Sequence, residues 1–245
     1  MDAITVSHLD KRFKIPHEKK TTLLENIVGL MRRRVSYEEF WALKEVNFKV
    51  ENGESLGIIG DNGSGKSTLL KVIANILRPD RGKIGVSGRI APILELGIGF
   101  HPDLTVKENV QVYGSIMGLP NNEIKKRMST ILEFSGLERF KDAKLKNLSS
   151  GMQMRLGFSV AIETNPDIFL IDEALAVGDI DFSEKCMKKF RDFKTEKKTI
   201  ILVSHALDLV TEFCEKTVLL SNGEMAGYGR TNEIVDQYMK KPRAT

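Results

Sequence analysis

The stretch that decides the fold is a glycine-rich loop, Gly60-Asp61-Asn62-Gly63-Ser64-Gly65-Lys66-Ser67. It fits the pattern G-x-x-x-x-G-K-[ST], in which glycines let the backbone bend tightly and turn its N–H groups toward phosphates. The apolar run Ser55–Ile59 before the loop predicts a buried strand, and Ser67–Leu77 after it predicts a helix. Because strand, loop and helix follow in that order, we expect a phosphate-binding loop rather than a glycine-rich turn that binds nothing.

The residue types within this loop have distinct chemical tasks. The Lys66 ammonium can reach the β- and γ-phosphates of a nucleotide, and the Ser67 hydroxyl can bind Mg²⁺. The N-terminus of the helix that follows, with Thr68 in its first turn, adds a favourable partial positive charge.

Composition excludes several classes of protein. The chain has 245 residues, 37 Lys+Arg against 33 Asp+Glu, and a net charge of +4, which is too mild to predict a nucleic-acid partner. No apolar run approaches the roughly 18 residues of a membrane span, and Met1–Val6 does not resemble a signal peptide. The two cysteines form neither a disulfide framework nor a metal site, so we expect a reduced, cytoplasmic setting.

The rest of the chain alternates strand and helix patterns, which predicts an α/β fold with a largely parallel sheet covered on both faces. Strands are expected at Ile4–Leu9, Ala42–Val50, Asp167–Ile171, Thr199–Ser204 and Thr217–Leu220, with shorter pieces in Lys83–Leu96. Helices are expected at Phe182–Lys194 and from Thr231. The middle, about residues 105–165, is expected to be a mostly helical inserted subdomain that opens with the capping-box spacing Thr105 to Glu108. We expect residues 1–245 to form a single domain.

Two acids end an apolar strand pattern, because Ile168–Ile171 is followed by Asp172 and Glu173. A carboxylate at a strand end near a phosphate loop can hold Mg²⁺, and the next carboxylate can orient and deprotonate an attacking water. Alone, the pair would equally suit an acidic turn, but its combination with the phosphate loop favours a catalytic role.

Three further motifs carry a resemblance to a known family. Leu148-Ser149-Ser150-Gly151-Met152-Gln153-Met154-Arg155 resembles the signature L-S-G-G-Q-x-Q-R of ABC transporters. The stretch from Asp172 to Asp179 looks like the second nucleotide motif of that family running into its dimer loop, and Val203-Ser204-His205 looks like its switch-histidine motif. The chain is therefore identified as a member of the ABC transporter ATPases, with a P-loop NTPase fold of ABC type, an inserted helical subdomain and an antiparallel β subdomain.

The resemblance implies how the parts work together. Two such subunits would pack head to tail and trap two ATP molecules with Mg²⁺ between them. Each ATP would contact the loop of one subunit and the signature residues of the other, which are Ser149, Ser150, Gly151 and Met152. Glu173 would be the general base, His205 would contact the γ-phosphate and the attacking water, and Asp179 would communicate across the dimer.

Departures from the family pattern narrow the resemblance to one branch. The signature has Met152 where Gln is usual, and residues 92–105 lack the Gln that usually touches Mg²⁺, so Glu95 is its expected substitute. These segments resemble the branch that exports lipid-linked polysaccharides of the O-antigen, capsule or teichoic-acid type. That branch implies a separate transmembrane permease and a peripheral position on the cytoplasmic face of the cell (inner) membrane; the alternative is an ABC ATPase with a different cargo.

Two features near the N-terminus have open interpretations. The family stacks adenine on an aromatic residue of the first strands, and Phe13, Tyr37 and Trp41 are candidates, although Trp41 suits core packing equally. Residues 17–40 form a basic insertion, with Leu23, Leu24, Ile27, Val28 and Met31 at helical spacing beside Arg32-Arg33-Arg34. This amphipathic helix could lie on the membrane surface or the permease, or pack on its own domain.

Overall fold

The structure, a computed structural model, describes residues 1–17, 36–94, 96–172 and 179–240. Six strands form one sheet in the order β5-β6-β7-β3-β8-β9, and three form a second sheet in the order β2-β1-β4. The large sheet contains β3 (Ser55–Gly60), β5 (Ile90–Ile93), β6 (Ile168–Asp172), β7 (Thr199–Val203), β8 (Lys216–Ser221) and β9 (Glu224–Arg230). The small sheet contains β1 (Asp2–His17), β2 (Ser36–Glu51) and β4 (Arg81–Val86).

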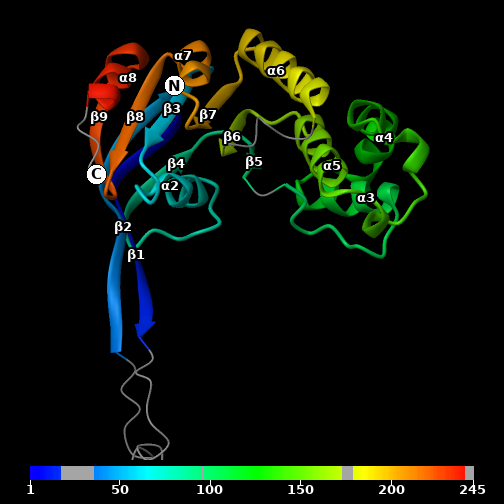
Figure 1. The fold of residues 1–245 in the computed structure, drawn as a ribbon, viewed down its shortest axis with the longest axis horizontal. Coiled ribbons are helices and arrows are strands. Elements are labelled where there is room, and N and C mark those ends of the chain that lie inside the picture. The colour runs from blue at the N-terminus through cyan, green and yellow to red at the C-terminus, as the bar shows by residue number, and fades with distance from the viewer. Residues whose placement is uncertain (18–35, 95, 173–178, 241–245) are drawn as a thin grey trace, which may run out of the picture.

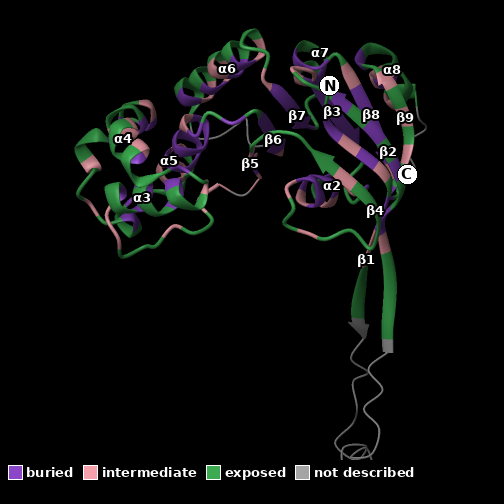
Figure 2. Cartoon of the chain, turned by 180° about the vertical axis from the view of Figure 1, so that it is seen from behind, coloured by how far each residue is buried: buried purple, intermediate pink, exposed green. Residues whose placement is uncertain are grey.

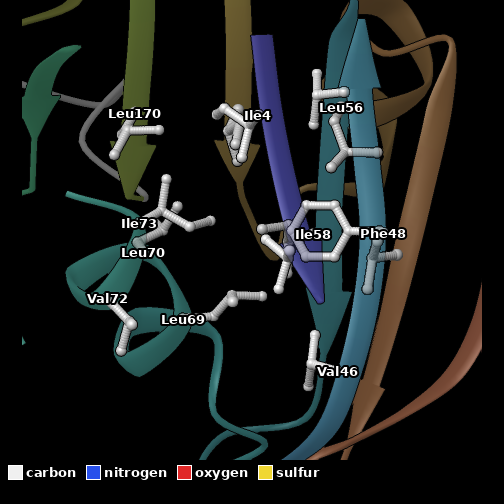
Figure 3. Packing of buried hydrophobic residues seen from close by; sticks show 14 of the residues in the cluster. Ile4, Val46, Phe48, Leu56, Ile58, Leu69, Leu70, Val72, Ile73 and Leu170 are labelled. Carbon is white, nitrogen blue, oxygen red and sulfur yellow. The ribbon is translucent and has the colours of Figure 1, made fainter. Parts of the chain in front are cut away.

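The large sheet is parallel from β5 to β8, and only β9 runs antiparallel. All six residues of β3 and all five of β7 are buried, as expected for strands covered on both faces. One face packs against α2 (Lys66–Ile73) and the small sheet, where Leu69, Leu70 and Ile73 meet side chains of both sheets (Figure 3). The opposite face is covered by α6 (Ile180–Thr195), α7 (Leu207–Phe213) and α8 (Thr231–Lys240), with many phenylalanines in its core. This confirms the predicted α/β fold with a largely parallel sheet.

The middle of the chain forms a helical region to one side of the sheets (Figure 1). It contains α3 (Val106–Ile116), α4 (Asn121–Ser135) and α5 (Ser150–Glu163), which share an apolar core of their own. The capping box that opens α3 is present: the Glu108 N–H donates to Thr105 Oγ1, and the Thr105 N–H donates to Glu108 Oε2. The helix therefore begins where the sequence pattern predicts.

The first two strands are much longer than expected. They pair from Asp2 opposite Glu51 to His17 opposite Ser36, and their far ends project from the body as a two-stranded ribbon (Figures 1 and 2). Residues 36–40, which we assigned to the insertion, are therefore strand, and Tyr37 and Trp41 lie within β2 rather than before it. The ribbon escaped prediction because it has no buried face, so its sequence lacks the alternation of half-buried strands. The amphipathic pattern from Leu23 to Met31 lies outside the described residues.

The C-terminal part contains two elements that the sequence did not lead us to expect, α7 and β9. The strand β9 follows a tight turn in which Asn222 and Gly223 both have positive φ, 50° and 82°, the conformation that joins hairpin strands. The glycines of β9 weaken the sequence pattern that is typical of a strand. Gly227 is nevertheless suited to its position, because it packs against α8, where a Cβ would lie 3.1 Å from Ile234 Cδ1. The helix α2 is shorter than expected and is followed by Asn75, whose φ of 58° leaves the helical region.

Within the described residues, none of the helices has both the length and the apolar character that crossing a membrane requires.

Candidate nucleotide site

Three of the predicted motifs meet at one edge of the large sheet. The strands β6, β7 and β3 are neighbours and parallel, with Val203 beside both Asp172 and Ile58. Their carboxyl ends lead into Asp172, into Ser204 and His205, and into the phosphate loop, respectively. The crevice outside the carboxyl ends of parallel strands is where α/β proteins of this kind bind ligands. Since β7 separates β6 from β3, Asp172 and Ile58, two residues before Gly60, lie about 10 Å apart across the sheet.

The loop has a backbone that only glycine adopts readily. Gly60, Gly63 and Gly65 have φ values of 150°, 77° and 105°. A Cβ on Gly60 would lie 2.2 Å from the Leu220 carbonyl oxygen, and one on Gly65 would lie 2.5 Å from that of Ala42. Side chains at these two positions would therefore push the loop off the neighbouring strands β8 and β2.

Lys66 and Ser64 point polar groups into the interior of this loop. The Lys66 side chain is buried, and its Nζ donates hydrogen bonds to the carbonyl oxygens of Gly60 (2.9 Å) and Asp61 (3.0 Å). Ser64 Oγ is one of three buried side-chain polar atoms without a hydrogen-bond partner in the described part of the chain. Ser67 and Thr68 occupy the first turn of α2, where backbone N–H groups favour an anion. A buried ammonium, an unsatisfied hydroxyl and a helix N-terminus together suit a phosphate chain.

The predicted acids are only partly described. Asp172, the last residue of β6, is half-buried at the carboxyl end of that strand. Glu173 and Glu95 lie outside the described residues, so their roles stay predictions. His205 follows β7 and is exposed, and the turn that carries it is held by the Ala206 N–H, which donates to Ser204 Oγ at 3.0 Å.

The signature residues open α5, in the helical region and away from α2 of the same chain (Figure 1). Ser149 is the N-cap and accepts from the Met152 N–H at 3.2 Å, while Ser150 and Gly151 occupy the first turn. Met152 packs its side chain against the apolar core of the helical region, which is where this departure from Gln is accommodated. The exposed first turn of α5 presents N–H groups with a favourable dipole for a second anion.

Asp179 joins the signature helix to the next helix of the chain. Its Oδ1 accepts from the Phe182 N–H at 3.0 Å and so caps α6, and its Oδ2 accepts from Arg155 Nη2 at 2.9 Å. Arg155 lies on α5 and its guanidinium also covers the Phe182 ring at 5.7 Å. The sequence singled out Asp179, but it gave no sign of this Arg155 contact, because the two residues are far apart in the chain.

The candidate adenine platforms lie on the β1–β2 pair beside the phosphate loop. Trp41 is half-buried with the Arg12 guanidinium 5.6 Å from its ring, whereas Phe13 is 37% exposed with Lys11 Nζ 5.5 Å from its ring. Because Arg12 pairs with Trp41 and Phe13 with Phe40, the two aromatic side chains lie on opposite faces of the ribbon. Tyr37 lies near the start of β2, toward the far end of the ribbon, and is 58% exposed. Which of them stacks on adenine stays a prediction.

Two side chains that bear on this region were missed by sequence reasoning. Asn109 is fully buried on α3 and holds residues 101–105 through its amide, and Tyr238 on α8 donates to Asp61 of the phosphate loop. For Asn109, the available signal was an Asn at an apolar position of an amphipathic helix pattern. For Tyr238 there was none, because its role depends on a contact between distant parts of the chain.

A phosphate loop after one parallel strand, with an acidic strand two positions away, defines the site of a P-loop nucleoside triphosphatase. Residues 43–176 match the family described as "ABC transporter", and the chain belongs to that family. It is an ATP-binding cassette that binds and hydrolyses ATP.

The chain is similar to several curated proteins over nearly its full length. It is 42% identical over 237 residues to the O-antigen export system ATP-binding protein RfbB of Klebsiella pneumoniae, covering 96% of each protein. It is 42% identical over 243 residues to the RfbB of Myxococcus xanthus, covering 97% of this chain and 56% of that protein. It is 37% identical over 238 residues to the teichoic acids export ATP-binding protein TagH of Lactococcus lactis, covering 97% and 50%. The chain thus spans about half the length of the last two relatives.

Solved structures show the same fold. A dimeric post-hydrolysis state of the ATP-binding cassette MJ0796 bound to ADP and phosphate is 25% identical, with a TM-score of 0.73, covering 93% of this chain and 98% of that one. The ATP-binding subunit of an ABC transporter superposes with a TM-score of 0.75 at 23% identity, covering 99% and 95%.

Proposed function

We propose that this chain is the ATPase subunit that powers export of a lipid-linked polysaccharide through a separate transmembrane permease. The observation that carries the proposal is the 42% identity, over 96% of both chains, to a relative named for O-antigen export. The relatives named for teichoic-acid export extend the class of cargo to lipid-linked glycans in general. The chain would act at the cytoplasmic face of the cell (inner) membrane, held there by the permease.

The residues at the carboxyl ends of the parallel strands supply the chemistry of the nucleotide site. The loop Gly60–Thr68 binds the phosphates, with Lys66 as the cation nearest the γ-phosphate. Ser67 and Asp172 offer a hydroxyl and a carboxylate, hard oxygen donors that suit Mg²⁺, and Glu95 would complete the set. The bound ion would neutralise charge on the phosphates. Glu173 takes the proton of the attacking water and His205 orients that water against the γ-phosphate.

A head-to-tail homodimer would complete each site. The first turn of α5 lies away from the phosphate loop of its own chain, which supports its use on the nucleotide of a second copy (Figure 1). There Ser149 and Gly151, with Ser150 and Met152 beside them in the signature, would donate to the γ-phosphate, where negative charge develops during hydrolysis. Asp179, tied to α5 through Arg155, would link that contact to the catalytic strand end of its own chain.

The basic insertion would contact the permease or the membrane surface. The ribbon that leads to it exposes Phe40 and Ile15 at 48% and 43%, which supports a contact at that end of the chain. Replacing Leu24 and Val28 by Glu is expected to release the protein from membranes and to leave ATP binding intact. Unchanged membrane association of that variant would refute a contact of the insertion with the permease or membrane surface, and it would leave the export proposal unaffected.

The experiment that tests the cargo is made in cells. The protein is depleted, and lipid-linked polysaccharide is quantified on the cytoplasmic and outer faces of the membrane. Accumulation inside with loss outside, restored by the wild-type copy and not by Glu173→Gln, is the expected result. An unchanged distribution would refute glycan export, and it would leave an ABC ATPase with a different cargo as the function.

A further inference from the structure

The C-terminal helix α8 is held rigidly on the large sheet. At its first residue, Thr231 Oγ1 donates to the Cys214 carbonyl oxygen at 2.8 Å and accepts from Thr217 Oγ1 at 3.0 Å, and both bonds are buried. Near its other end, Gln237 Nε2 donates to the Ala226 carbonyl oxygen at 3.1 Å. These bonds fix the helix at both ends, so side chains on its last turn have defined positions.

On that last turn, Tyr238 reaches the phosphate loop. Its ring packs against the core between α8 and the sheet, and its hydroxyl donates to Asp61 Oδ1 at 3.1 Å. Asp61 is the second residue of the loop, and its own carbonyl oxygen accepts from Lys66 Nζ at 3.0 Å. The side chain of Asp61 is therefore tied to α8, while its backbone belongs to the loop.

A carboxylate in this loop opposes the function of the loop. The loop gathers N–H groups and an ammonium around phosphate, and a negative side chain there repels a polyanion over the same short range. A hydrogen bond from a fixed donor holds the carboxylate on the α8 side and disperses its charge. Without that donor, the Asp61 side chain would sample rotamers closer to the bound phosphates.

We propose that Tyr238 is a positioning residue of the nucleotide site, which holds the Asp61 carboxylate away from the phosphates of ATP. The effect is electrostatic, so it grows with the charge of the nucleotide and weakens as salt screens it. It concerns nucleotide binding and does not depend on which cargo the transporter carries.

The test removes one hydroxyl from the full chain. Tyr238→Phe is expected to raise the Kd for MgATP about two- to five-fold, the range typical of an exposed electrostatic contact between charged groups, and to raise the Kd for MgADP by a smaller factor. Both factors are expected to shrink as the salt concentration rises. Tyr228→Phe is the matched control, because it removes a hydroxyl that donates to the Lys49 carbonyl oxygen at 3.0 Å on β2, outside the loop; it is expected to leave both values unchanged.

A second background separates the proposed role from general loosening of α8. In an Asp61→Asn chain the repelling charge is absent, so adding Tyr238→Phe is expected to change the Kd for MgATP by less than two-fold. An unchanged Kd in Tyr238→Phe would overturn the proposal. So would equal weakening of MgATP and MgADP, or the same weakening in the Asp61→Asn background, because each would show that Tyr238 acts without the carboxylate.

Discussion

Asn109 provides a test in which the same residue is changed in two ways, only one of which makes the stability depend on pH. Its fully buried amide accepts from the His101 N–H at 2.7 Å and faces three carbonyl oxygens, those of His101, Leu104 and Thr105, at 2.9 to 3.2 Å. It thereby fixes the segment between β5 and α3, which follows the position of the predicted metal ligand Glu95.

The loss of stability expected for Asn109→Ala depends on which hydrogen-bond partners of Asn109 keep another partner. The three carbonyl oxygens keep other donors, namely the N–H groups of Leu104, Leu145 and residue 109 itself. Only the His101 N–H loses its acceptor. One unsatisfied, partly buried donor costs about 1–3 kcal/mol, so we expect the free energy of unfolding to fall by about 2 kcal/mol.

Asn109→Asp keeps the His101 bond but places a carboxylate against three carbonyl oxygens in a buried site. An uncompensated buried charge costs about 3–5 kcal/mol, so at pH 8 this variant is expected to be less stable than the Ala variant. Burial raises the pKa of the introduced carboxyl in the folded state above its value in the unfolded chain. Lowering the pH through the folded pKa protonates the carboxyl and removes the penalty, so the deficit relative to wild type must shrink toward pH 5.

Urea unfolding of wild type and both variants between pH 5 and pH 8 measures these differences, with Asn122→Asp on the exposed surface of α4 as control. An Asp variant as stable as the Ala variant at pH 8, or a deficit that does not shrink at pH 5, would refute the reasoning.

Three further results are expected. Leu70→Ala, which empties a fully buried position between α2 and the sheets, should lower the free energy of unfolding by about 2–5 kcal/mol in urea titrations; a loss under about 1 kcal/mol would contradict the packing. Burial raises the pKa of both Cys186 and Cys214 to about 12, so a thiol reagent at pH 8 should label neither in the native protein and both in denaturant. Ser149→Ala removes the acceptor of the Met152 N–H and should lower the free energy of unfolding by about 1 kcal/mol, measured by thermal unfolding. Ser149→Thr keeps a hydroxyl and should retain most of that stability; equal losses in the two variants would argue against the cap.

The parts of the fold that the sequence predicted are those with strong local signals. The buried strands Thr199–Val203 and Ile168–Asp172 are short apolar runs, and the glycine-rich loop predicts both the strand before it and the helix after it. Since parallel strands end at a common edge, the meeting of Asp172 with the loop was implied, although the strand that separates them was not. That spacing depends on strand order, which no local pattern encodes.

What the sequence could not show depends on contacts between distant residues. In the far part of the ribbon, residues 11–15 and 37–41 share no buried face, and only the pairing of β1 with β2 defines it. The bonds from Arg155 to Asp179 and from Tyr238 to Asp61 join positions 24 and 177 residues apart. Each looks like an ordinary surface residue until the chain is folded.

The ribbon has a mechanical consequence. In the described chain β4 pairs with β1 only up to Asp10, so β2 is the only strand there that pairs with residues 11–17, which extend about 23 Å at ~3.3 Å per residue. Its root is Ala42, whose carbonyl oxygen packs directly against Gly65 of the phosphate loop. A displacement at the far end of this arm would therefore reach the backbone of the phosphate loop at Gly65. A contact made by the ribbon and the geometry of the phosphate loop would then be mechanically coupled.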